Sequence, residues 1–107
     1  MKINGITTTT FEADMTKWPG VVLVDFFGDH CPSCRHLLPI LEELAGELDG
    51  RVKFMKADVQ QNGELARRLG IIAVPTVIVL KGGEMVARLV GLQNRQRLLE
   101  AIQMAEA

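Results

Sequence analysis

An apolar run at residues 21–27, VVLVDFF, constrains the fold of this chain more than any other stretch. A short run of this kind, preceded by the chain breaker Trp18-Pro19-Gly20, is typical of a strand that is covered on both faces. The stretch VKFMKADV at residues 52–59 predicts a second buried strand. A helical pattern separates the two runs, so the sequence predicts an α/β protein with helices on both faces of a mixed sheet.

The remaining elements follow from spacing and breakers. The helix between the two strands carries apolar residues at helical spacing, and Pro39 is expected to kink it: Leu37, Leu38, Leu41, Leu44, Ala45 and Leu48. A short first helix is expected near Thr9, because Thr9 and Glu12 fit a capping box. Residues 62–69 suit a helix closed by Gly70, and residues 93–105 suit an amphipathic one. Gly82-Gly83 between two apolar runs predicts a hairpin. The expected sheet has about five strands, with about four helices.

Size and charge limit the range of functions. The chain has 107 residues, enough for one domain, which we expect to span residues 1–107. Its net charge is -1, which favours neither a nucleic-acid nor a membrane partner. The start of the chain lacks the apolar core of an export signal, so we expect a cytoplasmic protein. In that reducing compartment a close cysteine pair is more often catalytic or metal-binding than structural.

The two cysteines of the chain stand three residues apart at the start of the second predicted helix. With Cys31 as the cap, Pro32 takes the first helical position, where its missing N–H costs nothing. The amides of Ser33 and Cys34 then point back at the Cys31 sulfur and favour its thiolate form. The Cys34 sulfur lies within bridging range but turned inward. We therefore expect an exposed nucleophile at Cys31 and a sheltered resolving thiol at Cys34.

In this arrangement the chain resembles the thioredoxin family, from about residue 6 to residue 102. The landmarks are VLVDF before CPSC, Pro39 eight residues after the first cysteine, KADV, VPT at 74–76, GGE at 82–84 and VG at 90–91. Each is weak alone, but together, in order and at nearly matching spacing, they are specific. The resemblance implies a thioredoxin fold and thiol–disulfide exchange with protein disulfides.

The resemblance also implies catalytic roles. Asp25 becomes the buried carboxylate beneath the pair, where it accepts and donates the proton of Cys34. An aspartate inside an apolar run is costly unless it has a function, although a polar strand end facing a loop is the alternative. Lys56 approaches Asp25 from the neighbouring strand, or else is a solvated strand-end lysine. Pro39 receives no chemical role.

The substrate surface is implied in the same way. Pro75 becomes a cis-proline packed against the cysteines, and Val74 pairs its backbone with an extended substrate segment. A shallow groove around them is completed by the remaining candidate substrate-binding residues: His30, Pro32, Ser33, Ile72, Ala73 and Gly91. For several of these the plainer interpretation is a turn glycine or a core or rim aliphatic residue.

A dithiol cycle needs a source of electrons. The resemblance implies a separate reductase, usually a flavoprotein, and a chain that works as a monomer on disulfide-containing proteins. No glycine-rich nucleotide fingerprint follows a strand here, so no cofactor is expected in this chain.

The chain departs from the family at the active-site motif. The family usually has Gly-Pro between the cysteines, where this chain has Pro32-Ser33, and tryptophan where this chain has Phe27 and His30. Moving the proline restores an amide donor that faces Cys31, and the Ser33 hydroxyl and a protonated His30 add to it. We therefore hypothesise a weaker reductant than a Gly-Pro thioredoxin, although His30 could simply line the groove. His36 is expected to be a solvated surface residue.

Three other interpretations remain open. His30, Cys31, Cys34 and His36 offer four metal ligands, but a zinc site usually takes two pairs from separate segments, so no metal is expected. A non-enzymatic binding subunit would not need the cysteine pair or Asp25. An oxidant, an isomerase or a glutaredoxin would use the same chemistry at a less reducing potential.

Overall fold

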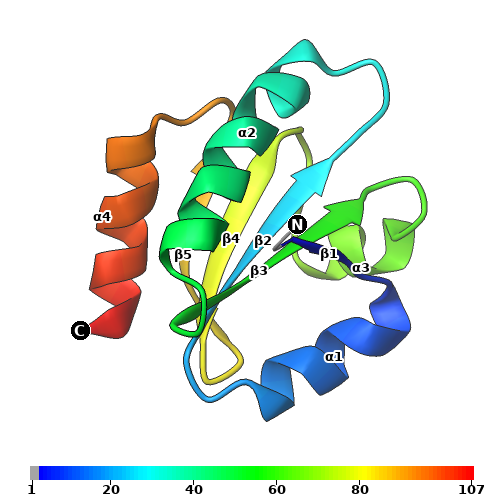
Figure 1. Cartoon of the computed structure of the whole chain (residues 1–107). Helices are drawn as coiled ribbons and strands as arrows, with labels where there is room; N and C mark the ends of the chain where they lie inside the picture. Colours follow the sequence, from blue (N-terminus) through cyan, green and yellow to red (C-terminus); the bar gives the residue numbers. More distant parts are fainter. Residues whose placement is uncertain (1–2) are drawn as a thin grey trace.

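The structure, a computed structural model, describes residues 3–107, without the side chains of residues 15 and 16. The elements follow one another as β1 Asn4–Gly5, α1 Thr8–Lys17, β2 Val21–Phe27, α2 Pro32–Glu47, β3 Val52–Asp58, α3 Gly63–Arg68, β4 Thr76–Lys81, β5 Glu84–Val90 and α4 Arg95–Glu106 (Figure 1). The α/β class and the mixed sheet predicted from the sequence are confirmed.

The five strands form one sheet in the order β1-β3-β2-β4-β5. β1, β3 and β2 run parallel, whereas β4 is antiparallel to β2 and β5 is antiparallel to β4. The register of β2 and β3 places Asp25 directly beside Lys56. The two residues that approach each other at the candidate site are therefore held by the centre of the sheet.

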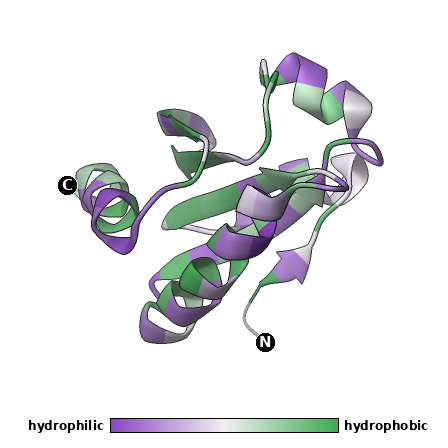
Figure 2. Cartoon of the chain, turned by 90° about the horizontal axis from the view of Figure 1, so that it is seen from above, coloured by the Kyte–Doolittle hydropathy of each residue, from purple (hydrophilic) through white to green (hydrophobic). Residues whose placement is uncertain are grey.

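The core is divided by the sheet into two layers. On one face α2 and α4 pack through fully buried side chains such as Leu37, Leu41 and Leu98. On the other face Phe11 of α1 and Leu65 of α3 cover the opposite sides of the strands. Figure 2 shows mainly green, hydrophobic central strands between helices that alternate green and purple. Each fully buried leucine stabilises the fold by about 1.5–3 kcal/mol, so this scaffold tolerates a costly polar group in its middle.

Two details near the N-terminus differ from the sequence prediction. The capping box of α1 joins Thr7 and Thr10, not Thr9 and Glu12: the Thr7 amide donates to Thr10 Oγ1 over 3.0 Å. The predicted cap was wrong because four consecutive threonines offer several equivalent starts. β1, only two residues long, was not located from the sequence, because so short a strand carries no periodicity.

The other predicted elements fall where the sequence placed them. β2 spans residues 21–27, and α2 continues past Pro39 to Glu47. Gly82 and Gly83 connect β4 to β5 with φ angles of 60° and 82°. Positive φ at both central residues matches the right-handed twist of a two-residue hairpin, and glycine adopts it without strain.

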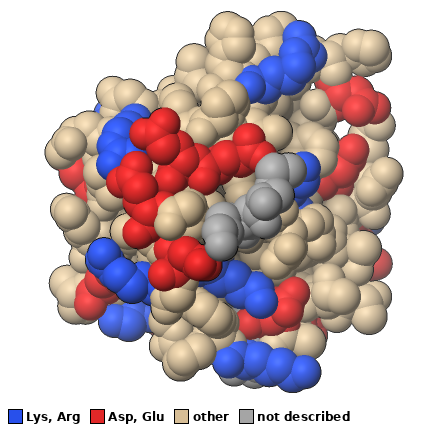
Figure 3. Space-filling view, in the orientation of Figure 1, with Lys and Arg blue, Asp and Glu red and all other residues tan. Residues whose placement is uncertain are grey.

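The surface over α2 is acidic, as the red side chains in Figure 3 show. Arg95 at the start of α4 pairs with Glu43 and Glu47 of α2 and so ties the two helices of one layer together. The contact lowers the pKa of the Glu47 carboxyl, because the guanidinium donates hydrogen bonds to it.

Within residues 3–107, none of the helices combines the length and the apolarity needed to cross a bilayer.

Candidate active site

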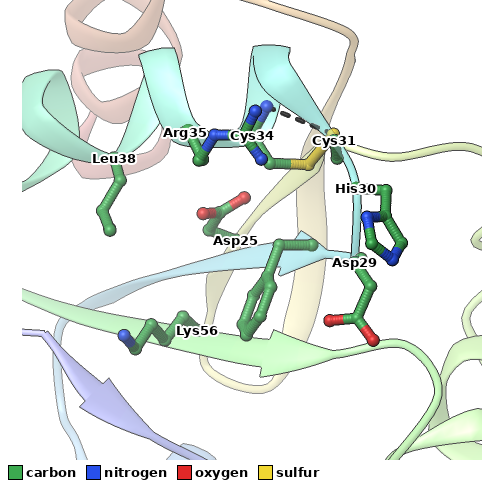
Figure 4. A pocket seen from close by; sticks show the side chains of 10 residues that line it. Asp25, Asp29, His30, Cys31, Cys34, Arg35, Leu38 and Lys56 are labelled. Atoms are coloured by element: carbon green, nitrogen blue, oxygen red, sulfur yellow. Dashed lines mark hydrogen bonds between the residues drawn. A yellow bond between two sulfur atoms is a disulfide. The ribbon is translucent and has the colours of Figure 1, made fainter.

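The cysteines lie at the N-terminus of α2, where Cys31 is the N-cap and Pro32 the first helical residue. The two cysteines form a disulfide, and their Cα atoms lie 5.3 Å apart. The amide of Cys34 donates to Cys31 Sγ over 3.2 Å (Figure 4). The Ser33 hydroxyl lies 3.6 Å from the same sulfur. Cys31 Sγ thus faces the positive end of a helix, an arrangement that stabilises a thiolate once the disulfide is reduced.

The expected difference in exposure between the cysteines is absent from the disulfide form. Cys31 is 8% exposed and Cys34 6%, so both are buried. The prediction of an exposed Cys31 was therefore wrong for this state. Because Cys31 closes the helix end with its side chain, the first turn of α2 covers it. What distinguishes the two sulfurs is the hydrogen-bond donors around Cys31.

Asp25 lies on β2 beneath the first turn of α2, between the sulfurs and β3 (Figure 4). It is 2% exposed, and its Oδ1 has no hydrogen-bond partner among the described residues. Burial raises the pKa of Asp25 from 3.8 to about 7, and the positive charge of Lys56 opposes part of that rise. A carboxyl group with a pKa close to neutrality exchanges protons readily at physiological pH.

Lys56 on β3 adjoins Asp25 in the sheet, and its side chain is half-buried. Its Nζ lies 5.9 Å from the centroid of the Phe27 ring. The sequence prediction that Lys56 approaches Asp25 from the neighbouring strand agrees with this register. The lysine therefore acts on Asp25 as a nearby charge, and its ammonium also contacts an aromatic face.

A cleft of about 290 Å³ opens below the disulfide. Its walls come from the end of β2, the segment before α2, the first two turns of α2 and β3: Asp25, Phe27, Gly28, Asp29, His30, Cys31, Cys34, Arg35, Leu38 and Lys56 (Figure 4). The cleft thus brings together five residues predicted from the sequence. The other five lining residues were not among the predicted site residues, and two of these, Arg35 and Leu38, lie on α2. Their spacing of four and seven positions from Cys31 places them on one helix face, which was the available signal.

His30 precedes the disulfide in an unusual backbone conformation. Its φ is 53°, in the left-handed region that non-glycine residues seldom adopt, and its side chain is exposed. The ring lines the cleft beside Asp29 (Figure 4). His36, in the second turn of α2, is exposed, as expected of a surface residue.

The segment before β4 lies beside this cleft rather than in its walls. The Val74–Pro75 peptide bond is cis, as expected, and Pro75 is buried while Val74 is half-buried. A Cβ on Gly28 would meet Val74 Cγ2 at 3.3 Å, so the glycine lets residue 74 approach the chain that leads to the cysteines. The Gly91 amide donates to the Pro75 carbonyl over 2.8 Å, which brings Gly91 to the same place.

The other predicted groove residues border this segment. Ile72 is 96% exposed, Ala73 is exposed, and Thr76 Oγ1 donates to the Ala73 carbonyl over 2.6 Å. Pro32 is exposed and Ser33 half-buried at the first turn of α2.

In the part of the chain that the structure describes, no three His, Cys, Asp or Glu side chains converge as metal ligands would.

Comparison with known proteins identifies the family to which this site belongs. The family model described as Thioredoxin matches residues 2–104. A protein from Staphylococcus saprophyticus named Thioredoxin is 39% identical over 103 residues, which cover 96% of this chain and 97% of the relative. The chain belongs to the thioredoxin family.

Other relatives extend the same result. A Thioredoxin of Bacillus subtilis is 38% identical over 102 residues, 95% of this chain and 96% of its own length. A Thioredoxin of Rickettsia bellii is 37% identical over 99 residues, 92% of this chain and 94% of its own length. With a thioredoxin fold and a cysteine pair at bridging distance, the chain is a thiol–disulfide oxidoreductase, and the reduction of protein disulfides is favoured over the glutaredoxin, isomerase and oxidant alternatives.

Proposed function

We propose that the chain reduces protein disulfides by dithiol exchange, with Cys31 as the nucleophile and Cys34 as the resolving thiol. The observation that carries this proposal is the position of Cys31 Sγ at the N-terminus of α2. There the sulfur accepts a hydrogen bond from the Cys34 amide, and the buried carboxyl group of Asp25 lies below the pair. Thiolate stabilisation at one sulfur and a proton acceptor below the other are what the two steps of exchange require.

In the first step the Cys31 thiolate attacks one sulfur of the substrate disulfide. That disulfide breaks, a mixed disulfide forms with Cys31, and the second substrate sulfur leaves as a thiolate that takes up a proton. In the second step Cys34 gives its proton to Asp25 and attacks Cys31 Sγ. The Cys31–Cys34 bond forms, the mixed disulfide breaks, and the first substrate sulfur leaves as a thiolate that takes up a proton. Two electrons have then passed to the substrate.

The other proposed roles support these steps. With a pKa of about 7, Asp25 is populated in both proton states at neutral pH, and Lys56 keeps its charged state accessible. The extended substrate backbone pairs with Val74 beside Pro75, in a groove shared with Gly91, Ile72 and Ala73. His30, Pro32 and Ser33 border this groove at the start of α2. Exposed apolar side chains at Ile72, Val90 and Leu92 suit substrates with apolar residues next to the cysteine.

Regeneration of the dithiol is assigned to a separate reductase of the flavoprotein type. The cycle is placed in the cytoplasm, because a reducing pair needs a reducing compartment. One copy carries out the cycle as a single thioredoxin-like domain, since every group named above belongs to one chain. The Ser33 hydroxyl near Cys31 Sγ supports a less negative reduction potential than that of a Gly-Pro family member.

Replacing the resolving cysteine tests the proposal. Reduced Cys34→Ser protein mixed with a disulfide-containing peptide is expected to keep the peptide attached to Cys31, as mass spectrometry under non-reducing conditions would detect. Wild-type protein releases the peptide, and the matched control Cys31→Ser forms no adduct. An adduct of equal yield on both variants would contradict the assigned roles, and an adduct on neither would favour a binding subunit.

A further inference from the structure

Arg88 on the edge strand β5 reaches across to the C-terminal end of α3. One guanidinium nitrogen donates to the Gly70 carbonyl over 3.0 Å, and the other donates to the Leu69 carbonyl. Arg88 Nη2 also lies 3.5 Å from Met85 Sδ of its own strand. The fork therefore spans two consecutive backbone carbonyls, a geometry for which a planar guanidinium is suited and a lysine ammonium is not.

These carbonyls are the ones that the helix end leaves open. The Ile71 amide bonds back to the Ala66 carbonyl and the Gly70 amide to the Arg67 carbonyl, which together form a Schellman motif around Gly70 at φ 70°. That motif satisfies the carbonyls of residues 66 and 67, whereas those of residues 69 and 70, at and just past the helix end, lie beyond the reach of its two bonds. Arg88 supplies the donors, and its charge complements the negative end of the helix.

The segment that follows is the one that carries Val74 and Pro75. At its far end it is held by the bond from Thr76 Oγ1 to the Ala73 carbonyl and by the bond from the Gly91 amide to the Pro75 carbonyl. Between these anchors Ile72 is 96% exposed and contributes almost nothing to packing. The position of residues 71–74 is therefore set at the two ends of the segment. At the first end Ile71 packs against the core, and Arg88 holds the carbonyls of residues 69 and 70.

We propose that Arg88 is a positioning residue for substrate binding, which fixes the substrate-pairing segment through the end of α3. This inference rests on the proposed function, because it assumes that a peptide pairs with Val74. Arg88 donates to the carbonyls of residues 69 and 70 and to Met85 Sδ, and not to the cysteines, so it acts on the binding of extended substrates and leaves the sulfur chemistry unchanged.

The test compares two disulfides that share a leaving group. One is a short linear peptide whose central cysteine carries thionitrobenzoate, and the other is free cysteine carrying the same group. Reduced wild-type protein, Arg88→Met and Arg88→Lys are mixed with each in stopped flow, and release of thionitrobenzoate is followed by absorbance. Arg51→Met is the matched control, because Arg51 pairs with Glu106 at the opposite end of the sheet.

For Arg88→Met we expect the half-saturating peptide concentration to rise about fivefold, equal to about 1 kcal/mol, with an unchanged maximal rate. Arg88→Lys should recover part of the loss, because it can still donate to one carbonyl. The rate with the cysteine derivative should match wild type for both variants, and Arg51→Met should match it on both compounds.

Three outcomes would overturn the inference. If Arg88→Met had the same half-saturating peptide concentration as wild type, the contact between Arg88 and the end of α3 would have no effect on substrate binding. An equal loss of rate on the peptide and on the cysteine derivative would indicate general damage to the protein. If urea unfolding shows that Arg88→Met does not fold, the same comparison of the two compounds is made with Arg88→Lys, and its result decides whether the inference holds. Wild-type protein that released thionitrobenzoate from neither compound would instead refute the proposed function, and the inference with it.

Discussion

Replacing Asp25 with asparagine should stabilise the oxidised protein, and the gain should grow with pH. The pKa of Asp25 is about 7 in the folded protein and 3.8 without burial. A folded-state pKa above the unfolded value means that the folded state favours the protonated form, so stability is lost as pH rises between the two values and is level above the higher one. The full difference between the two pKa values corresponds to a loss of about 4 kcal/mol in the free energy of unfolding, at about 1.4 kcal/mol per pKa unit.

The comparison is made with oxidised wild-type protein and Asp25→Asn by urea unfolding between pH 5 and pH 8. The free energy of unfolding of the variant should exceed that of wild type by about 4 kcal/mol at pH 8 and by about 2 kcal/mol at pH 5. The change with pH is the firmer quantity, because it cancels any difference in packing between a protonated carboxyl and an amide. A constant gap across this range, or a less stable variant at pH 8, would refute the claim that burial raises this pKa.

Three further changes address the neighbours of Asp25 and Cys31. Lys56→Met should move the pH-dependent loss of stability to higher pH, because the lysine charge lowers the pKa of Asp25; Lys56→Arg should not, and an unmoved profile in the Met variant would exclude the coupling. Ser33→Ala should make the midpoint potential in glutathione buffers about 10–30 mV more negative, because the thiolate loses a hydroxyl donor, and an unchanged midpoint would remove that role. His30→Gly should be more stable than His30→Ala by about 1 kcal/mol in urea, because only glycine adopts φ 53° without strain, and equal stabilities would contradict the left-handed backbone.

The larger elements were predictable because burial imposes a pattern on them. The residues of β2 are buried on both faces except at its last position, and this is why the apolar run 21–27 matches the strand from end to end. Gly82 and Gly83 identified the hairpin because only a few residue types tolerate positive φ twice in succession. The start of α1 was not determined in this way, since any of the threonines 7–10 can accept an amide.

The candidate site was predictable wherever a local rule connected residues. Cys31 and Cys34 share one helical turn, and Asp25 stands out because it is charged within an apolar strand. Arg88 and its partners at residues 69 and 70 lie eighteen or nineteen positions apart in the chain. No periodicity relates the side chain of an edge strand to the end of a helix, so this contact becomes visible only once the sheet places β5 beside α3.

The difference between the two sulfurs arises from the helix and not from burial. In the disulfide the two cysteines are exposed by 8% and 6%, so accessibility does not decide which one attacks. In the proposed cycle the position in the helix decides it. Cys31 is the cap and its sulfur accepts a hydrogen bond from the Cys34 amide, whereas Cys34 lies within the first turn, above an Asp25 whose charge depends on pH. Because the cap position follows from the spacing of the cysteines and Pro32, the sequence already predicts the proposed order of attack, although it did not predict the burial of Cys31. The buried Asp25 carboxyl, which we propose accepts the Cys34 proton, also lowers the stability of the fold at neutral pH, and the two apolar layers on either side of the sheet offset that loss.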